Sequence, residues 1–220
     1  MKIFRQYGYV WGWTDARWGD GKQEDRLTHF AQTIGFNTEK KLVRCRQVHG
    51  NVVAKVDSWE PSIYPETDGL ISESSTVVLG VYTADCVPIF IFVPGLKRYS
   101  IVHAGWRGVQ KQIVLESLRL FQNYWNVSSE KLKVYIGPHI QSCCYEVGEE
   151  VSAQFPLAAV HHQNKFLLNL TEAISQQLIQ HKVLLENIEN SLDCTFCNTQ
   201  YFSFRRDQTK KRMLSFISIQ

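Results

Sequence analysis

The amino-acid sequence predicts a mixed α/β or α+β fold in which mixed β-sheets pack as a sandwich. Val77–Tyr82 and Val87–Val93 are short, continuous apolar runs, which are typical of strands buried on both faces. Helix-like segments are interspersed among the strand-like ones. His49-Gly50-Asn51 has the composition of a hairpin turn. Many strands, a hairpin and interspersed helices favour this class over a doubly wound parallel fold.

The remaining strands follow from apolar runs bounded by turn residues. Leu42–Val48 and Val52–Val56 flank the predicted hairpin turn. In chain order, the full set of predicted strands is Leu42–Val48, Val52–Val56, Val77–Tyr82, Val87–Val93, Tyr99–His103, Leu132–Ile136, Tyr201–Phe204 and Met213–Ile219. The predicted loops are Trp18–Glu24, which is rich in glycine and charge, the proline-containing Trp59–Asp68, and His161–Asn164.

Three segments are predicted to be helices. Apolar side chains recur near every 3.6 residues in Val109–Trp125, which is the period of an amphipathic helix. Val147–Phe155 and Thr171–His181 are the other two segments. No repeat or linker divides the 220 residues, so we expect one domain over residues 1–220.

Composition excludes several classes of function. The net charge is only +3, from 24 basic and 21 acidic residues, which argues against a dedicated nucleic-acid binder. No run approaches the ~20 apolar residues of a membrane span, and no signal peptide is recognisable at the N-terminus. We therefore expect a cytoplasmic protein with reduced cysteines and no membrane partner. The sequence does not indicate an oligomeric state.

Three residues at predicted strand ends and turns could form a metal site. His49 lies in the predicted hairpin turn, Cys86 between two apolar strands, and His103 at the end of a strand. Two histidines and one cysteine form a zinc ligand set with one open position, which is the catalytic pattern. Such a zinc lowers the pKa of its water to about 7. Two alternatives stay open: Cys86 could be a buried hydrophobe, or a thiolate nucleophile with His103 as its base.

A second candidate site is the turn Gly105-Trp106-Arg107-Gly108, which joins a predicted strand to a predicted helix. Backbone amides at a helix N-terminus bind anions, and Arg107 could grip a phosphate or carboxylate with its forked guanidinium. The alternative is a tight turn with a surface arginine. Local sequence alone favours neither interpretation.

Cys194-Thr195-Phe196-Cys197 is a CxxC motif, which could be half a zinc site or a redox pair. The adjacent Cys143 and Cys144 could complete a set of four ligands. Two neighbouring residues rarely point at one ion, so we interpret these cysteines as structural packing. Arg205 and Arg206 follow the predicted strand at Tyr201–Phe204 and are expected to be solvated.

Several motifs in a fixed order resemble one known family, the laccase-domain or polyphenol oxidase (YfiH-like) proteins. The likeness is strongest over Leu42–Glu150 and returns near the C-terminus. The motifs are Gln47-Val48-His49-Gly50, Thr83-Ala84-Asp85-Cys86-Val87-Pro88, His103-Ala104-Gly105-Trp106-Arg107-Gly108, Ile136-Gly137-Pro138, Cys144-Tyr145-Glu146-Val147-Gly148 and Phe202-Ser203-Phe204-Arg205-Arg206-Asp207. One departure is Leu168-Asn169-Leu170, where many members carry an acidic residue between the leucines.

The resemblance implies a layered α/β/β/α sandwich and a zinc ion held by His49, Cys86 and His103. Members of the family are described as purine nucleoside phosphorylases with an adenosine deaminase side activity. The expected substrates are phosphate and adenosine, inosine, guanosine or methylthioadenosine, and the products are the base and the sugar 1-phosphate. Some bacterial members are described as peptidoglycan-editing amidases, which makes a muramyl precursor carrying L-serine the alternative substrate.

Further residues are expected to contact the substrate. Arg44 and Gln47 lie on the predicted strand that leads to His49, and Arg107 is placed to bind phosphate. Asp68 and Tyr145 complete the expected set. Copper oxidase chemistry would require repeated His-x-His pairs, which the sequence lacks, so zinc is expected in preference to copper. A non-enzymatic binding module with a purely structural zinc is a further alternative.

Overall fold

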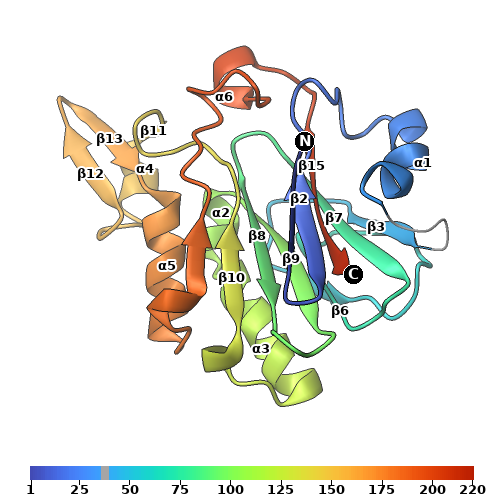
Figure 1. Cartoon of the computed structure of the whole chain (residues 1–220). Coiled ribbons are helices and arrows are strands. Elements are labelled where there is room, and N and C mark those ends of the chain that lie inside the picture. Colours follow the sequence, from blue (N-terminus) through green and yellow to red (C-terminus); the bar gives the residue numbers. More distant parts are fainter. Residues whose placement is uncertain (36–39) are drawn as a thin grey trace.

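The computed structural model describes residues 1–35 and 40–220 and has the predicted class of fold (Figure 1). Two six-stranded sheets dominate the described residues. The strand order in the first sheet is β1 (Lys2–Gln6), β2 (Tyr9–Trp13), β15 (Met213–Ile219), β7 (Val77–Thr83), β3 (Lys41–Cys45) and β5 (Ile63–Tyr64). In the second it is β14 (Ile188–Asn190), β10 (Lys133–Ile136), β8 (Val87–Phe92), β9 (Tyr99–Ala104), β6 (Gly69–Ser72) and β4 (Val53–Lys55).

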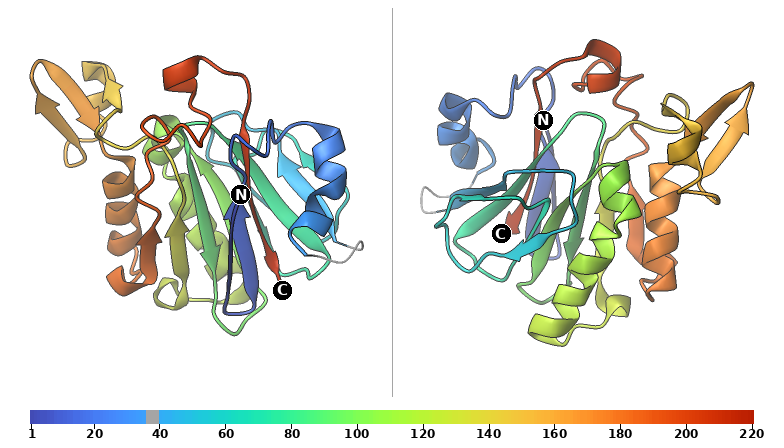
Figure 2. Two further views of the ribbon diagram at one scale, coloured as in Figure 1. Left: turned by 45° about the horizontal axis from the view of Figure 1, so that its top comes forward. Right: turned by 180° about the vertical axis from the view of Figure 1, so that it is seen from behind.

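The helices and a small third sheet surround these two sheets. The helices are α1 (Glu24–Thr33), α2 (Trp106–Gln110), α3 (Ile113–Trp125), α4 (Glu149–Ser152), α5 (Leu170–Gln180) and α6 (Phe204–Asp207), with 3₁₀ turns at Ser129–Lys131 and Leu185–Asn187. The third sheet contains β11 (Glu146–Val147), β13 (Lys165–Leu168) and β12 (Ala159–His162). The β12–β13 hairpin projects from the body of the molecule (Figures 1 and 2). No helix of the described residues is long and apolar enough to cross a membrane.

Three apolar clusters hold the layers together. The first lies between the two sheets and contains Trp11, Leu79 and Phe90. The second joins the outer face of the second sheet to α2, α3 and α5, which run along that face (Figure 2). In the third, Phe30 of α1 packs edge-on against Phe216 of β15, at a centroid distance of 4.8 Å. These clusters give the layer order helix, sheet, sheet, helix.

The predicted hairpin over Leu42–Val56 was wrong. β3 belongs to the first sheet and pairs with β7, whereas β4 belongs to the second sheet and pairs with β6, and both pairings are parallel. The segment between them crosses from one sheet to the other. Its backbone N–H groups at residues 48–50 donate to the buried Asp68 carboxylate instead of to a neighbouring strand.

Other predicted elements differ at their boundaries. The helix over Val109–Trp125 is two helices, α2 and α3, because Gln112 adopts a left-handed conformation with φ of 60° between them. In the segment Val147–Phe155 the helix is limited to the short α4, and Val147 belongs to β11. The predicted strand over Tyr201–Phe204 was wrong: Ser203 accepts a hydrogen bond from the Arg206 N–H and so caps α6.

The predicted loops also contain elements. Trp59–Asp68 includes β5, and in His161–Asn164 the two histidines end β12 while residues 163–164 form the turn of the β12–β13 hairpin. The five strands β7, β8, β9, β10 and β15 and helix α5 match their predictions within a few residues. Asn169 caps α5 by accepting a hydrogen bond from the Glu172 N–H.

Candidate metal centre and active site

His49, Cys86 and His103 converge at one edge of the two sheets. His49 follows β3, Cys86 lies in the turn between β7 and β8, and His103 is close to the end of β9. One donor atom of each residue lies within 4.8 Å of the donors of the other two. The His49 and His103 rings meet edge to face, with their centroids 4.9 Å apart. The three residues could therefore hold a metal ion, as the sequence predicted.

Gly105 leaves space for these ligands. A Cβ atom at this position would lie 3.0 Å from Cys86 Sγ and 3.2 Å from His49 Cδ2. Either contact is closer than an ordinary van der Waals separation. The glycine after β9 is thus required by the close approach of two candidate ligands, and not by its backbone conformation.

Asp68 lies beneath the site and fixes His103. Its Oδ1 atom is 2.8 Å from His103 Nδ1, and the carboxylate also accepts backbone hydrogen bonds from Val48, His49 and Gly50. Burial disfavours the charged carboxylate, but the bonds from His103 and the backbone outweigh this effect and lower the Asp68 pKa. Because Nδ1 of His103 is hydrogen-bonded to Asp68, Nε2 is the ring nitrogen directed to the site. Asp68 itself does not line the cavity described below.

Cys86 and His103 each favour the charged form of the other. Burial raises the Cys86 pKa, but the adjacent His103 and His49 outweigh it and lower the pKa to about 6. Burial lowers the His103 pKa, yet the Cys86 thiolate and Asp68 raise it to about 9. The thiolate is the form in which cysteine binds metals and acts as a nucleophile. This geometry is compatible with both chemical interpretations of Cys86.

A cavity of about 650 Å³ opens above the three residues. This volume lies within the usual range of small-molecule sites. Its walls combine aromatic rings with cationic side chains. The lining residues are Lys22, Cys45, Arg46, Gln47, His49, Ile63, Tyr82, Ala84, Asp85, Cys86, His103, Ile140, Tyr145, Phe204, Arg205 and Arg212.

Two expected substrate contacts line this cavity. Tyr145 lies beside the Arg205 guanidinium, 5.3 Å from the ring centroid. Gln47 also lines the cavity, but its side-chain amide is committed to the backbone of Tyr82. Its Nε2 donates to the Tyr82 carbonyl at 2.8 Å, and its Oε1 accepts from the Tyr82 N–H at 2.7 Å. Gln47 therefore ties the chain after β3 to the neighbouring β7.

Arg44 and Arg107 do not line the cavity. Arg44 donates to the Tyr82 hydroxyl at 3.0 Å and pairs with Glu24 at 3.3 Å. Arg107 is exposed and stacks on the Trp106 ring, 4.3 Å from its centroid. The helix that follows Gly105 is the five-residue α2, which is too short to provide the macrodipole expected at that turn.

The cationic residues of the cavity wall, Lys22, Arg46, Arg205 and Arg212, were not expected from the sequence, and Arg205 is the one tied most directly to the metal site. Its backbone N–H donates to Asp85 Oδ2 at 2.7 Å, and its Nη1 donates to the Glu146 carbonyl at 2.7 Å. Asp85 directly precedes Cys86, so this bond fixes the C-terminal loop against the metal site. The Ser203 cap before Arg205 was the available sequence signal. Arg206 is not simply solvated either, because it donates to the carbonyls of Thr195, Phe196 and Tyr201.

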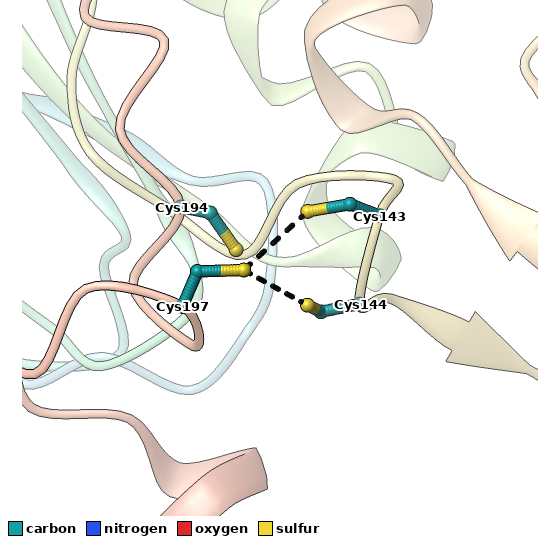
Figure 3. Close-up of side chains that lie close together, drawn as sticks. All are labelled: Cys143, Cys144, Cys194 and Cys197. Carbon is teal, nitrogen blue, oxygen red and sulfur yellow. Dashed lines mark hydrogen bonds between the residues drawn. The ribbon is translucent and has the colours of Figure 1, made fainter.

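A second group of candidate metal ligands lies outside the cavity. Cys143, Cys144, Cys194 and Cys197 bring four sulfur atoms within 4.8 Å of one another (Figure 3). The expectation that the two adjacent cysteines do not point at one ion was wrong. Their loop folds back so that both side chains face Cys197. Like the His/Cys group, this group could hold a metal ion.

Comparison with known proteins shows the family to which the chain belongs. Residues 20–220 match the family model described as multi-copper polyphenol oxidoreductase laccase. The chain belongs to this family. It is 33% identical over 190 residues to a purine nucleoside phosphorylase of Clostridium acetobutylicum, covering 83% of this chain and 78% of that protein. It is 32% identical over 206 residues to the purine nucleoside phosphorylase YfiH of Escherichia coli, covering 90% of this chain and 81% of that protein.

A solved structure shows the same fold. The crystal structure of YlmD from Geobacillus stearothermophilus superimposes with a TM-score of 0.89 at 29% identity, covering 97% of this chain and 92% of that one. The predicted fold class and the resemblance to the laccase-domain family are therefore confirmed.

Proposed function

We propose that this protein is a zinc-dependent purine nucleoside phosphorylase. The observation that carries the proposal is the position of His49, Cys86 and His103 at the base of a cavity with aromatic and cationic walls. Relatives about one-third identical over most of the chain are named purine nucleoside phosphorylases, which supports the same reaction here. The reaction converts a purine nucleoside and phosphate into the free base and the sugar 1-phosphate.

The donor set favours one zinc ion over copper. Two histidines and a cysteine with an open fourth position are typical of catalytic zinc. A blue-copper site adds a weak axial ligand, usually methionine, to the same three, and no methionine lines the cavity. When bound, zinc would supply a Lewis acid next to the substrate. Asp68 supports this role because it orients His103 from behind.

The cavity walls suit both proposed substrates, the purine nucleoside and phosphate. Tyr145 and Phe204 offer ring faces on which a purine can stack. Arg205, with Arg46 and Arg212, can bind the phosphate dianion through charge-assisted hydrogen bonds. Holding phosphate against C1′ of the sugar would convert a bimolecular reaction into a positioned one. We propose adenosine, inosine, guanosine and methylthioadenosine as substrates, with deamination of adenosine as a side activity.

A product scan tests the proposal. Purified protein is incubated with each nucleoside, with and without phosphate, and the products are separated by chromatography. We expect free base to appear only when phosphate is present, and its formation to stop after zinc is chelated. His49→Ala should abolish it, whereas His181→Ala, which changes an exposed histidine at the end of α5, should not.

Assays of the same purified protein with a muramyl precursor and with a thiol-alkylating reagent separate the alternatives. Release of free serine from a muramyl precursor carrying L-serine, without phosphorolysis, would favour the amidase. Activity that survives chelation but is lost on alkylation of Cys86 would favour the thiolate nucleophile. Zinc-loaded protein that shows no phosphorolysis, no serine release and no Cys86-dependent activity would favour a binding module.

A further inference from the structure

The four cysteines outside the cavity come from two distant parts of the chain. Cys143 and Cys144 lie between β10 and β11, and Cys194 and Cys197 lie between β14 and α6. The Cys197 sulfur is 3.7 Å from that of Cys143 and 3.2 Å from that of Cys144. Figure 3 shows the sulfurs of both loops directed into one space. Four soft donors that share one space are the ligand set of a closed metal site.

The spacing fits a single tetrahedral ion. Zinc–sulfur bonds of about 2.3 Å in a tetrahedron place the sulfurs about 3.8 Å apart. The Cys143–Cys197 sulfur separation of 3.7 Å matches this value, the Cys144–Cys197 separation of 3.2 Å is somewhat shorter, and all four sulfurs lie within 4.8 Å of one another, which is close enough for one ion. An iron–sulfur cluster distributes its cysteines around several irons and so requires sulfurs that lie farther apart.

The surroundings of Cys194 favour a bound thiolate. The Gln141 N–H donates to its sulfur at 3.4 Å, and the N–H groups of Phe196 and Cys197 face the same sulfur. The cationic side chain of Arg206 lies near this sulfur and donates to the carbonyls of Thr195 and Phe196. Both features offset the negative charge that four thiolates leave on a divalent ion.

We propose that Cys143, Cys144, Cys194 and Cys197 hold one zinc ion in a closed structural site. On binding, each thiol releases its proton to solvent, and the four thiolates fill the coordination sphere. This site is separate from the His49, Cys86 and His103 group, and the proposal does not depend on the reaction catalysed there.

The proposed ion would join two loops that shape the cavity. Tyr145 directly follows Cys144, and Thr195, between the other two cysteines, donates to Asp85 Oδ1 at 2.7 Å. Asp85 also accepts the backbone N–H of Arg205. One ion therefore would fix the loop of Tyr145 to the loop of Arg205. Both residues line the cavity, and the Arg205 guanidinium lies over the Tyr145 ring.

Metal counting tests the proposal. Zinc is measured per chain by elemental analysis and native mass spectrometry in the full-length protein. The two groups predict two equivalents in the unmodified protein. Cys194→Ser combined with Cys197→Ser should lose one equivalent, and His49→Ala should lose the other. Cys45→Ala, a buried cysteine outside both groups, is the control and should keep both. A cysteine double variant with unchanged zinc content would overturn the proposal.

A second measurement needs no variant and covers the case in which the double variant does not fold. Cys143 and Cys197 are exposed, so as free thiols they should react rapidly with a thiol reagent. We expect them to be protected until an organomercurial releases one zinc equivalent. Rapid reaction without zinc release would contradict the proposal. An intact mass lower by two hydrogens would also contradict it, since it would indicate a disulfide in place of the metal site.

Discussion

Nδ1 of His103 lies 2.8 Å from Oδ1 of Asp68, and both side chains are almost completely buried. The carboxylate thus fixes the ring orientation and leaves Nε2 for a metal or substrate. The same carboxylate accepts three backbone hydrogen bonds from the His49 turn. One residue therefore positions two of the three candidate ligands.

Asp68→Asn should weaken metal binding at the His/Cys group. The amide retains the shape of the carboxylate but removes the charge that orients His103, and loss of such a partner typically lowers metal affinity 10–100-fold. Competition with a chromophoric zinc chelator measures the change. Asp57→Asn removes an exposed carboxylate that pairs with Lys55 and serves as the control. Equal affinities for both variants would show that Asp68 does not orient a ligand.

Gly105→Ala should also reduce metal affinity, for a steric reason. The added methyl group would lie 3.0 Å from Cys86 Sγ and 3.2 Å from His49 Cδ2, so at least one ligand must move. We expect a loss of about 10-fold or more in zinc affinity, because ligands must keep their geometry closely. In Gly50→Ala the methyl group makes ordinary contacts, with its nearest neighbour at 3.4 Å, and affinity should change little. Unchanged affinity in Gly105→Ala would mean that the ligands do not meet at this point.

Arg205→Ala should raise the KM for phosphate by about 10–100-fold, since hydrogen bonds to charged groups contribute about 1.5–3 kcal/mol. Initial rates at varied phosphate concentration measure this effect. Arg107→Ala tests the residue that was expected from the sequence to contact phosphate, and we expect less than about a 3-fold change because Arg107 does not line the cavity. Arg119→Ala, on the exposed face of α3, controls for the loss of a positive charge. The reverse ranking of Arg205 and Arg107 would place the phosphate at the turn before α2.

Asn169→Ala should destabilise the protein by about 1 kcal/mol, because it removes the side chain that caps α5. The midpoint of urea unfolding should fall while the slope of the transition stays the same. Asn123→Ala, at an exposed position of α3, should change the midpoint little. A midpoint equal to that of Asn123→Ala would indicate that the cap contributes nothing.

Local sequence was sufficient to predict the strands and the helix whose formation depends mainly on their own residues. The apolar runs that became β7 and β8 are short and rich in β-branched and aromatic residues, which favours strands buried on both faces. Local sequence also accounts for helix α5, whose periodicity and cap are local. His49, Cys86 and His103 were candidate ligands because each lies at the end or turn of a predicted strand, and the resemblance to the laccase-domain family implied the same three; the structure brings them together as a group that could hold a metal ion.

Tertiary structure decided the features that depend on contacts between distant residues. The His49 turn crosses between sheets because Asp68, nineteen residues later, binds its N–H groups. Arg205, not Arg107, lines the cavity because Asp85 binds its backbone 120 residues away in the chain. Cys143 and Cys144 meet Cys197 only after two loops pack together. Sequence periodicity reports on neighbours along the chain, whereas these contacts arise when the packing of the sheets brings distant loops to one edge.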